Sequence, residues 1–320
     1  MEHRIVDYDA AGYDYRKYWD GRDYERWAED RALRRLVPRL GRTEWFIDFG
    51  GGFGRNAEHY RRQAARYVIA DYSATNLANA ATLLADDVAA GRAFLVRCDL
   101  NALPFVDRAF GAAMVVRVLH HLPEIDHALM EMGRVVARRW LVDVPIKHHA
   151  LGMLRGATRG EWGAVRGPQP LLTGSTTEPF WNFQLSAVRD VLAQAGWGTR
   201  VMASVNNLRR WDRRLPASLA RALSPAAEFV EATAQRGGRG WWGPSQFLIA
   251  WREGQTTQAT LADVVTVGED APAVASRVCC PSCRGGLSWT AEEATCACCD
   301  RTYRKEGAYW DFTASPCAEK

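Results

Sequence analysis

The sequence predicts an α/β protein built on a mainly parallel sheet of seven strands, followed by a small cysteine-rich unit at the C-terminus. Two observations support this fold class. Between residues 22 and 251, short apolar runs alternate with stretches of helical length, and strands separated by helices form βαβ units whose parallel sheet is covered on both faces. In addition, seven of the eight cysteines lie after residue 278, without a secretion signal, which indicates a metal site rather than disulfides.

The individual elements follow from the apolar patterning. Seven apolar segments are expected to be strands: 44–49, 67–71, 93–98, 112–118, 140–146, 200–205 and 246–251. Helical patterns fall between them, at 22–40, 56–65, 74–90, 122–136, 185–195 and 215–233. Residues 147–180 are rich in Gly, Arg and Pro, and we expect them to form an insertion over the ligand edge of the sheet.

Charge and hydropathy exclude some functions. The chain carries 41 Lys and Arg against 37 Asp and Glu, and this net charge of +4 does not indicate a protein that coats nucleic acid. No apolar run approaches the length of a membrane span, and the first fifteen residues lack the pattern of a signal peptide. We therefore expect a cytoplasmic protein without a membrane partner.

A glycine run at residues 48–54 follows the first predicted strand. Glycines between a strand and a helix present backbone N–H groups at the helix N-terminus, where they hold a nucleotide-like ligand. The dinucleotide pattern G-x-G-x-x-G requires a glycine where this chain has Arg55. The pattern D-x-G-x-G-x-G matches instead, which favours a ligand other than a dinucleotide.

With Asp71 and Asp99 after the next two strands and the segment 116–122 after the fourth, the sequence resembles class I S-adenosylmethionine (SAM)-dependent methyltransferases of the type 11-like group. The resemblance implies a Rossmann-like fold and SAM as methyl donor. It also implies a set of cofactor-binding residues: Asp48, Gly50, Gly51, Gly52, Gly54, Asp71, Tyr72, Asp99, Leu100, Asn101 and Arg117.

The methyl acceptor is less constrained than the donor. A sulfonium methyl group is already activated, so a base is needed only when the nucleophile retains a proton. His120 and His121 follow the fourth strand and are candidate bases, while packing or capping at a helix start is the alternative role for both. No Asn/Asp-Pro-Pro-Tyr/Phe motif follows that strand, which argues against the usual exocyclic-amine methylation of DNA, RNA or glutamine, and we expect no DNA partner. We expect transfer to an O or N atom of a small-molecule metabolite, with RNA methylation and a non-catalytic SAM-binding partner as alternatives.

The C-terminal cysteines form two C-x-x-C pairs, Cys280 with Cys283 and Cys296 with Cys299. Four thiolates at these spacings bind structural Zn²⁺, although Cys279 and Cys298 are adjacent alternatives. The segment resembles the small zinc-ribbon activator subunits of tRNA and protein methyltransferases, here fused to the enzyme.

Four parts are expected along the chain. They are an N-terminal lid and helix (1–40), the methyltransferase domain (41–252), a linker (253–276) and the zinc ribbon (277–320). The sequence leaves the oligomeric state open.

Overall fold

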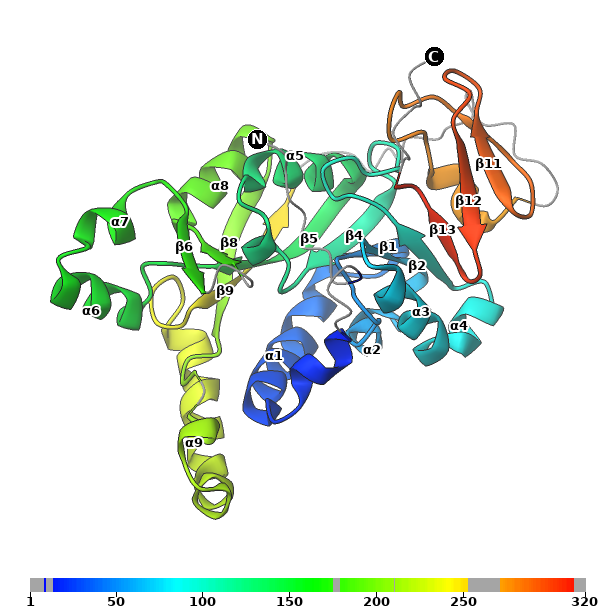
Figure 1. Ribbon diagram of the computed structural model, residues 1–320. Helices are drawn as coiled ribbons and strands as arrows, with labels where there is room; N and C mark the ends of the chain where they lie inside the picture. The colour runs from blue at the N-terminus through cyan, green and yellow to red at the C-terminus, as the bar shows by residue number, and fades with distance from the viewer. Residues whose placement is uncertain (1–8, 10–13, 175–178, 210, 253–270, 314–320) are drawn as a thin grey trace.

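The computed structural model describes residues 9, 14–174, 179–209, 211–252 and 271–313. Its main feature is one large sheet, in which the strands run in the order β10-β11-β12-β13-β3-β2-β1-β4-β5-β9-β8 (Figure 1). Seven of these strands belong to the main body: β1 (Thr43–Phe49), β2 (Ala64–Asp71), β3 (Ala93–Arg97), β4 (Phe110–Val115), β5 (Val136–Pro145), β8 (Gly198–Val205) and β9 (Ser245–Trp251). The other four are short and C-terminal: β10 (Leu287–Trp289), β11 (Glu293–Cys296), β12 (Thr302–Glu306) and β13 (Tyr309–Asp311).

The centre of the sheet is parallel and buried on both faces. Strands β3, β2, β1, β4 and β5 pair in parallel, whereas β9 runs antiparallel to both β5 and β8. Alternate residues of β1 enter two separate cores, because successive side chains of a strand point to opposite faces. Trp45 and Ile47 join one core, and Phe46 joins the other. The parallel register places the carboxyl ends of β1, β2 and β4 at the same edge.

Helices cover both faces of the sheet. Residues of α5 (Ile125–Val135) and α8 (Leu185–Gln194) lie in the first core. The second core includes residues of α1 (Asp23–Leu36), α2 (Ala57–Tyr60), α3 (Ala74–Leu83) and the 3₁₀ helix η2 (Val37–Leu40). Helix α4 (Ala85–Ala89) precedes β3, and α9 (Ala217–Gly237) packs against β8 and α1. The remaining 3₁₀ turns are η1 (Tyr15–Trp19), η3 (Leu119–His121), η4 (Asp212–Arg214) and η5 (Ala273–Arg277).

The predicted insertion at 147–180 forms its own small unit. It contains α6 (Ala150–Arg159), α7 (Trp162–Arg166) and the hairpin of β6 (Leu171–Gly174) with β7 (Pro179–Asn182). The buried Lys147 ties this unit to the end of β5, because its Nζ donates to the carbonyls of Ala164 (2.7 Å) and Gln169 (2.6 Å).

The structure corrects the predicted strand count. The expected seven strands are present, but the sheet has eleven strands, because β13 pairs in parallel with β3 through Tyr309–Leu95 and Trp310–Val96. The C-terminal unit therefore extends the sheet instead of standing apart from it, and its apolar residues share the first core.

Several predicted helices are shorter than expected. The helix at 22–40 ends at Leu36, where Pro38 enters the first turn of η2. The helix at 56–65 shrinks to α2, because β2 already begins at Ala64. The helix at 74–90 breaks at Leu84 into α3 and α4.

The predicted linker and the start of the predicted N-terminal lid lie mostly outside the described residues. The linker at 253–276 lies outside them except for its last residues, where η5 begins, and most of the first thirteen residues also lie outside. Within the described part of the chain, no helix is both long and apolar enough to cross a membrane.

Candidate cofactor and metal sites

The loop after β1 has a conformation that requires glycine. Gly50, Gly52 and Gly54 have φ angles of 61°, 56° and 81°, in the left-handed region that side chains disfavour. A Cβ on Gly50 would also lie 2.4 Å from Cγ2 of Val118. The backbone of the loop can therefore lie close to the end of β4 only because these positions carry no side chain.

Asp71, the last residue of β2, holds this loop in place. Its Oδ2 accepts a hydrogen bond from the Gly52 N–H (2.8 Å), and its Oδ1 accepts one from the Ser73 N–H (2.9 Å). Ser73 in turn caps α3 by accepting from the Asn76 N–H (3.1 Å). Burial raises the pKa of Asp71, while these N–H donors act against the shift. One carboxylate thus connects the glycine loop to the start of the next helix.

Asp48 lies beneath the loop, not in its opening. Its carboxyl is buried and accepts a hydrogen bond from the Tyr60 hydroxyl (3.1 Å). Burial raises the pKa of Asp48 to about 8, although Tyr60 and the charge of Arg55 act in the opposite direction.

A cavity of about 120 Å³ lies at this edge of the sheet. Of the residues predicted from the sequence, nine line it: Gly50, Gly51, Gly52, Asp71, Tyr72, Asp99, Leu100, Arg117 and His121. Four predicted residues do not: Asp48, Gly54, Asn101 and His120. The lining also contains Tyr15, from the predicted N-terminal lid, and nine residues that were not predicted as cofactor contacts: Phe53, Arg55, Asn56, Ser73, Asn76, Cys98, Val116, Val118 and Leu122.

Two of the predicted residues that do not line the cavity have structural roles beside it. Asn101 turns back to Asp99, since its backbone N–H (2.8 Å) and its Nδ2 (3.0 Å) both donate to Asp99 Oδ1. Gly54 faces the apolar interior, where a Cβ would lie 2.8 Å from Leu84.

Arg117 follows β4 and has two different environments. Its backbone adopts a φ of 60° and donates its N–H to Asp143 Oδ2 (3.1 Å), which stabilises an unfavourable turn. Its guanidinium points to α1 instead, within 3.6 Å of Glu25 and 3.4 Å of Glu29. The guanidinium of Arg117 is therefore paired with buried acids of α1, while the residue also lines the cavity.

The N-terminal segment closes over the cavity. The Arg55 guanidinium lies 3.9 Å from the centre of the Trp19 ring and pairs with the buried Glu29. The Tyr15 ring lies over Gly52, because a Cβ added to Gly52 would be 3.7 Å from that ring. Burial raises the pKa of Tyr15 to about 12. The sequence predicts a lid in residues 1–40, but no local pattern indicates these particular contacts, because they join residues far apart in the chain.

The two candidate histidines lie in η3. His121 lines the cavity, whereas His120 stacks on Phe180 of β7, with ring centres 4.2 Å apart and planes 16° apart. Burial and the charge of Arg117 lower the pKa of His121 to about 4. Burial and the neighbouring His121 lower the pKa of His120 well below its usual value. Both rings are neutral at pH 7, which leaves each of them with a nitrogen able to accept a proton.

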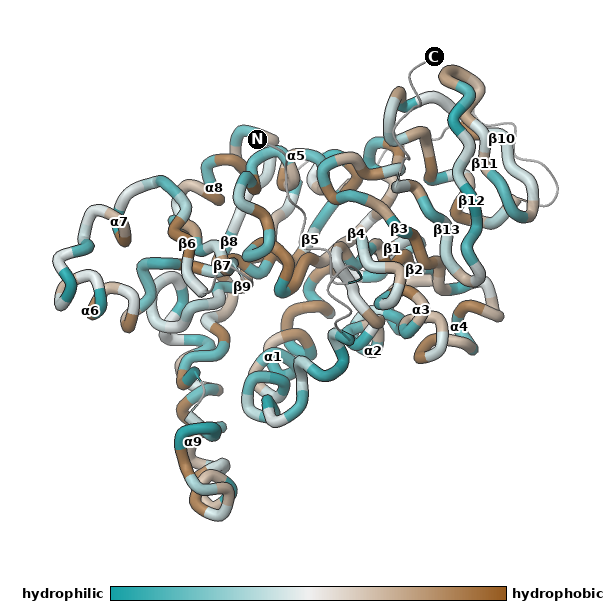
Figure 2. The backbone as a smooth tube through the Cα atoms, viewed as in Figure 1, coloured by the Kyte–Doolittle hydropathy of each residue, from teal (hydrophilic) through white to brown (hydrophobic). Residues whose placement is uncertain are grey.

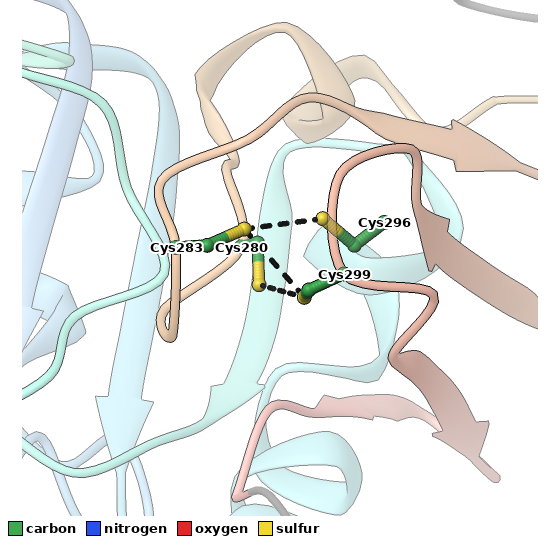
Figure 3. A group of neighbouring side chains, drawn as sticks. All are labelled: Cys280, Cys283, Cys296 and Cys299. Atoms are coloured by element: carbon green, nitrogen blue, oxygen red, sulfur yellow. Dashed lines mark hydrogen bonds between the residues drawn. The ribbon is translucent and has the colours of Figure 1, made fainter.

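The four predicted cysteines converge in the C-terminal unit (Figure 3). The sulfurs of Cys280, Cys283, Cys296 and Cys299 all lie within 4.8 Å of one another. Cys283 is 3.4 Å from Cys296, and Cys280 is 3.6 Å from Cys299. Cys279 and Cys298, which the sequence left as alternatives, are not members of this group.

The C-terminal unit contacts the main body beside the cavity. Arg284 donates to the Leu103 carbonyl (2.7 Å) and to Oε1 of Glu131 (2.5 Å) on α5. The Cys279 N–H donates to the carbonyl of Pro104 (3.0 Å). These bonds fix the segment that follows Asp99 and Leu100, two of the residues that line the cavity.

Comparison with known proteins agrees with this geometry. Residues 47–139 match the family model described as a methyltransferase domain. This part of the chain is a SAM-dependent methyltransferase domain. It contains the glycine loop, Asp71, Asp99 and both candidate histidines, His120 and His121. Four thiols of the C-terminal unit form a group able to bind a metal ion.

Solved structures show the same class I, Rossmann-like fold with a mostly parallel central sheet. A chain from the complex between the Haloferax volcanii Trm112 methyltransferase activator and a methyltransferase is 14% identical, with a TM-score of 0.51 over 79% of this chain and 98% of that chain. A Listeria monocytogenes protein named as an S-adenosylmethionine dependent methyltransferase is 12% identical, with a TM-score of 0.50 over 72% of this chain and 100% of that one. Magnesium protoporphyrin IX methyltransferase from Synechocystis PCC 6803, with bound SAH, is 15% identical, with a TM-score of 0.48 over 72% and 86%. A search of the curated proteins finds no match to the chain.

Proposed function

We propose that the protein transfers the methyl group of SAM to an O or N atom of a small-molecule metabolite. The observation that carries this proposal is the glycine loop held by Asp71 beside a cavity at the carboxyl edge of the parallel sheet. In open α/β sheets, ligands bind in that position. The modest net charge of the whole chain favours a small acceptor over RNA.

The cavity residues fit the parts of SAM in chain order. The Asp71 carboxylate has lone pairs left for the ribose hydroxyls, since each of its oxygens accepts only one backbone N–H. Asp99 and Leu100 lie where an adenine amino group and ring would bind, with Asn101 orienting Asp99. Asp48, Gly51, Gly54 and the rest of the loop support the methionine end. When bound, SAM supplies a methyl group that is already activated on a sulfonium.

We infer that η1 moves aside when the cofactor enters. Small-molecule sites typically measure roughly 300–1,000 Å³, and the cavity is about 120 Å³. Tyr15 lies over Gly52 at its opening, and Arg55 and Arg117 hold the neighbouring Trp19 through cation–π contacts at 3.9 Å and 4.9 Å. Closure of this segment over a bound ligand would exclude water from the reacting groups.

His121 is the better placed of the two candidate bases. It lines the cavity, whereas His120 is covered by Phe180. The neutral His121 ring has a nitrogen that would accept the proton of a hydroxyl or amine acceptor as the methyl group is transferred. His120 would then serve to orient its neighbour, since the ring centres lie 3.9 Å apart.

We propose that the cysteine group holds structural Zn²⁺ in a fused ribbon. A tetrahedral ion with Zn–S bonds of about 2.3 Å separates its sulfurs by about 3.8 Å, and the observed separations of 3.4–3.6 Å fit that donor set. Four thiolates would complete the coordination and leave no position for a substrate. The ion would stabilise a unit whose strands are only three to five residues long.

RNA is the alternative acceptor, and one contact favours it. The ribbon is bonded to the segment after Asp99 through Arg284 and Cys279, as an activating module would be. A structural neighbour comes from a complex that contains a methyltransferase activator.

Incubation of the purified full-length protein with methyl-labelled SAM and cell extract tests the proposal. The label should enter the low-molecular-weight fraction, and His121→Asn should reduce its transfer. Label confined to the RNA fraction would show that the alternative is correct. Absence of transfer to any fraction, with SAM binding intact, would contradict both.

A further inference from the structure

Helix α9 exposes an apolar face to solvent. Its first half projects from the molecule, and no side chain between residues 212 and 226 is buried (Figure 1). Phe229 is 74% exposed, and Leu219, Leu223 and Val230 are each more than 40% exposed. Spacings of four and seven residues place Leu219, Leu223 and Val230 on one face of the helix. Stretches of hydrophobic residues are visible along α9 in Figure 2. A set of large apolar side chains held in water on one projecting helix indicates a binding surface.

An arginine cluster lies at the base of the same helix. It consists of Arg31 and Arg35 from α1, Arg39 from η2, Arg236 from the last turn of α9 and Arg239 just after that helix, and the charges of the other four all act on Arg35. In the described part of the chain, none of the five forms an ion pair with an acid. The Nη2 of Arg35 is buried without a hydrogen-bond partner among the described residues. Burial and the charges of the other four arginines lower the pKa of Arg35.

Such a cluster favours an anionic partner. Arginines that repel one another destabilise the fold unless an anion neutralises them, and a guanidinium pairs well with a phosphate. The surrounding sequence has the same bias, because residues 147–242 contain thirteen Lys and Arg but only six Asp and Glu. That segment alone carries more positive charge than the net +4 of the whole chain.

Two tryptophans follow α9 directly. Trp241 and Trp242 remain 45% and 41% exposed, and their rings pack edge to face with centres 5.1 Å apart. The turn that carries them packs closely against Gly238, because a Cβ on Gly238 would lie 2.5 Å from the Cβ of Trp242. Exposed tryptophans beside cationic residues are typical of side chains at the boundary between lipid headgroups and acyl chains.

From the sequence we expect no membrane partner, because that expectation considers only membrane-spanning segments. We propose instead that this α9 surface, formed by the four apolar side chains, the arginine cluster and the two tryptophans, docks on an anionic phospholipid bilayer. The arginines would contact lipid phosphates, and Phe229 with its aliphatic neighbours would enter the outer layer of acyl chains. RNA would also pair with the arginines, but its charged backbone would not bury the apolar side chains of Leu219, Leu223 and Val230. The helix would lie on the surface of the bilayer, with its apolar side chains toward the acyl chains.

Co-sedimentation of the full-length protein with vesicles tests this surface without any methyl transfer, so its result is independent of the proposed acceptor. The probes are vesicles of phosphatidylcholine alone and vesicles that also contain phosphatidylglycerol. We expect binding to the anionic vesicles only, and weaker binding as salt increases. The double variant Arg236→Gln/Arg239→Gln should weaken binding about 25-fold, at about fivefold per arginine. Phe229→Ser should weaken it about tenfold.

Two control variants show whether vesicle binding depends on the α9 surface itself or only on the total charge and hydrophobicity of the protein. Arg61→Gln/Arg62→Gln removes two exposed arginines that lie next to α2, and Leu83→Ser removes a side chain of α3 that is 57% exposed. Both controls should keep wild-type binding within twofold. Equal loss in the controls, or no sedimentation with either vesicle, would overturn the proposal. So would a dimer in light scattering that Phe229→Ser converts to monomer, or binding of bulk RNA at a salt concentration where vesicles do not bind.

Discussion

Replacing Asp71 by Asn tests the link between the glycine loop and the cofactor. Asp71 accepts three hydrogen bonds, from the Gly52 N–H (2.8 Å), the Ser73 N–H (2.9 Å) and Nδ2 of Asn76 (3.4 Å). An asparagine would direct its NH₂ group at one of the two N–H donors. One buried donor would then lack an acceptor, at a cost of about 1–3 kcal/mol in the free energy of unfolding. The charged acceptor for a ribose hydroxyl would also disappear, which is worth about 1.5–3 kcal/mol.

We therefore expect Asp71→Asn to weaken SAM binding about 10- to 150-fold in isothermal titration calorimetry. Asp87→Asn is a matched control, because Asp87 is also buried and accepts from the Tyr67 hydroxyl and from Nε of Arg92 (3.1 Å), but does not line the cavity. That variant should lose stability and keep its SAM affinity within twofold. A SAM affinity of Asp71→Asn equal to that of the wild type would refute the assignment of the cofactor site, whatever the change in stability.

Three other predictions follow from the site. Because the pKa of Asp48 is raised to about 8, the folded protein holds this proton more tightly than the unfolded chain, and its contribution to stability is lost as pH rises from about 4 to 8. Asp48→Asn should gain a few kcal/mol relative to wild type between pH 5 and pH 8 in denaturant unfolding, and a constant difference would contradict the buried carboxyl. Cys280→Ser and Cys296→Ser should each lose zinc by elemental analysis, while the exposed Cys298→Ser keeps it; full zinc in the first two would exclude the proposed ligands. If His121 is the base, His121→Asn should lower kcat about 10²- to 10⁴-fold with little change in SAM affinity, and an unchanged kcat would remove that role.

The features that could be predicted from the sequence are those that depend on residues close together in the chain. The seven strands of the main body, the loop at 48–54 and Asp71 each depend on a local pattern of apolar residues, glycines and acids. The paired cysteines are close in sequence, so the spacing already indicated which four sulfurs meet.

The features that could not be predicted join distant segments. In the sequence, Arg55 only showed that the dinucleotide pattern lacks its last glycine. In the structure it forms an ion pair with Glu29, 26 positions away, and stacks on Trp19, 36 positions away. Phe180 covers His120 from an insertion that no local pattern aligns with η3. The shortened α2 shows the same limit, since the position where β2 begins depends on its pairing with Thr43.

The parallel pairing of β13 with β3 has a consequence for how the chain is made. Leu95 finds its partner Tyr309 only after more than two hundred further residues have been synthesised. Until then the main sheet ends at an unpaired β3, and open strand edges are where partly made chains associate with one another. The short strand β13 is thus the segment that closes this edge. A chain truncated before β13 would keep residues 47–139, which match the methyltransferase domain, and would still expose the edge of β3, so we expect it to aggregate more readily than the intact chain.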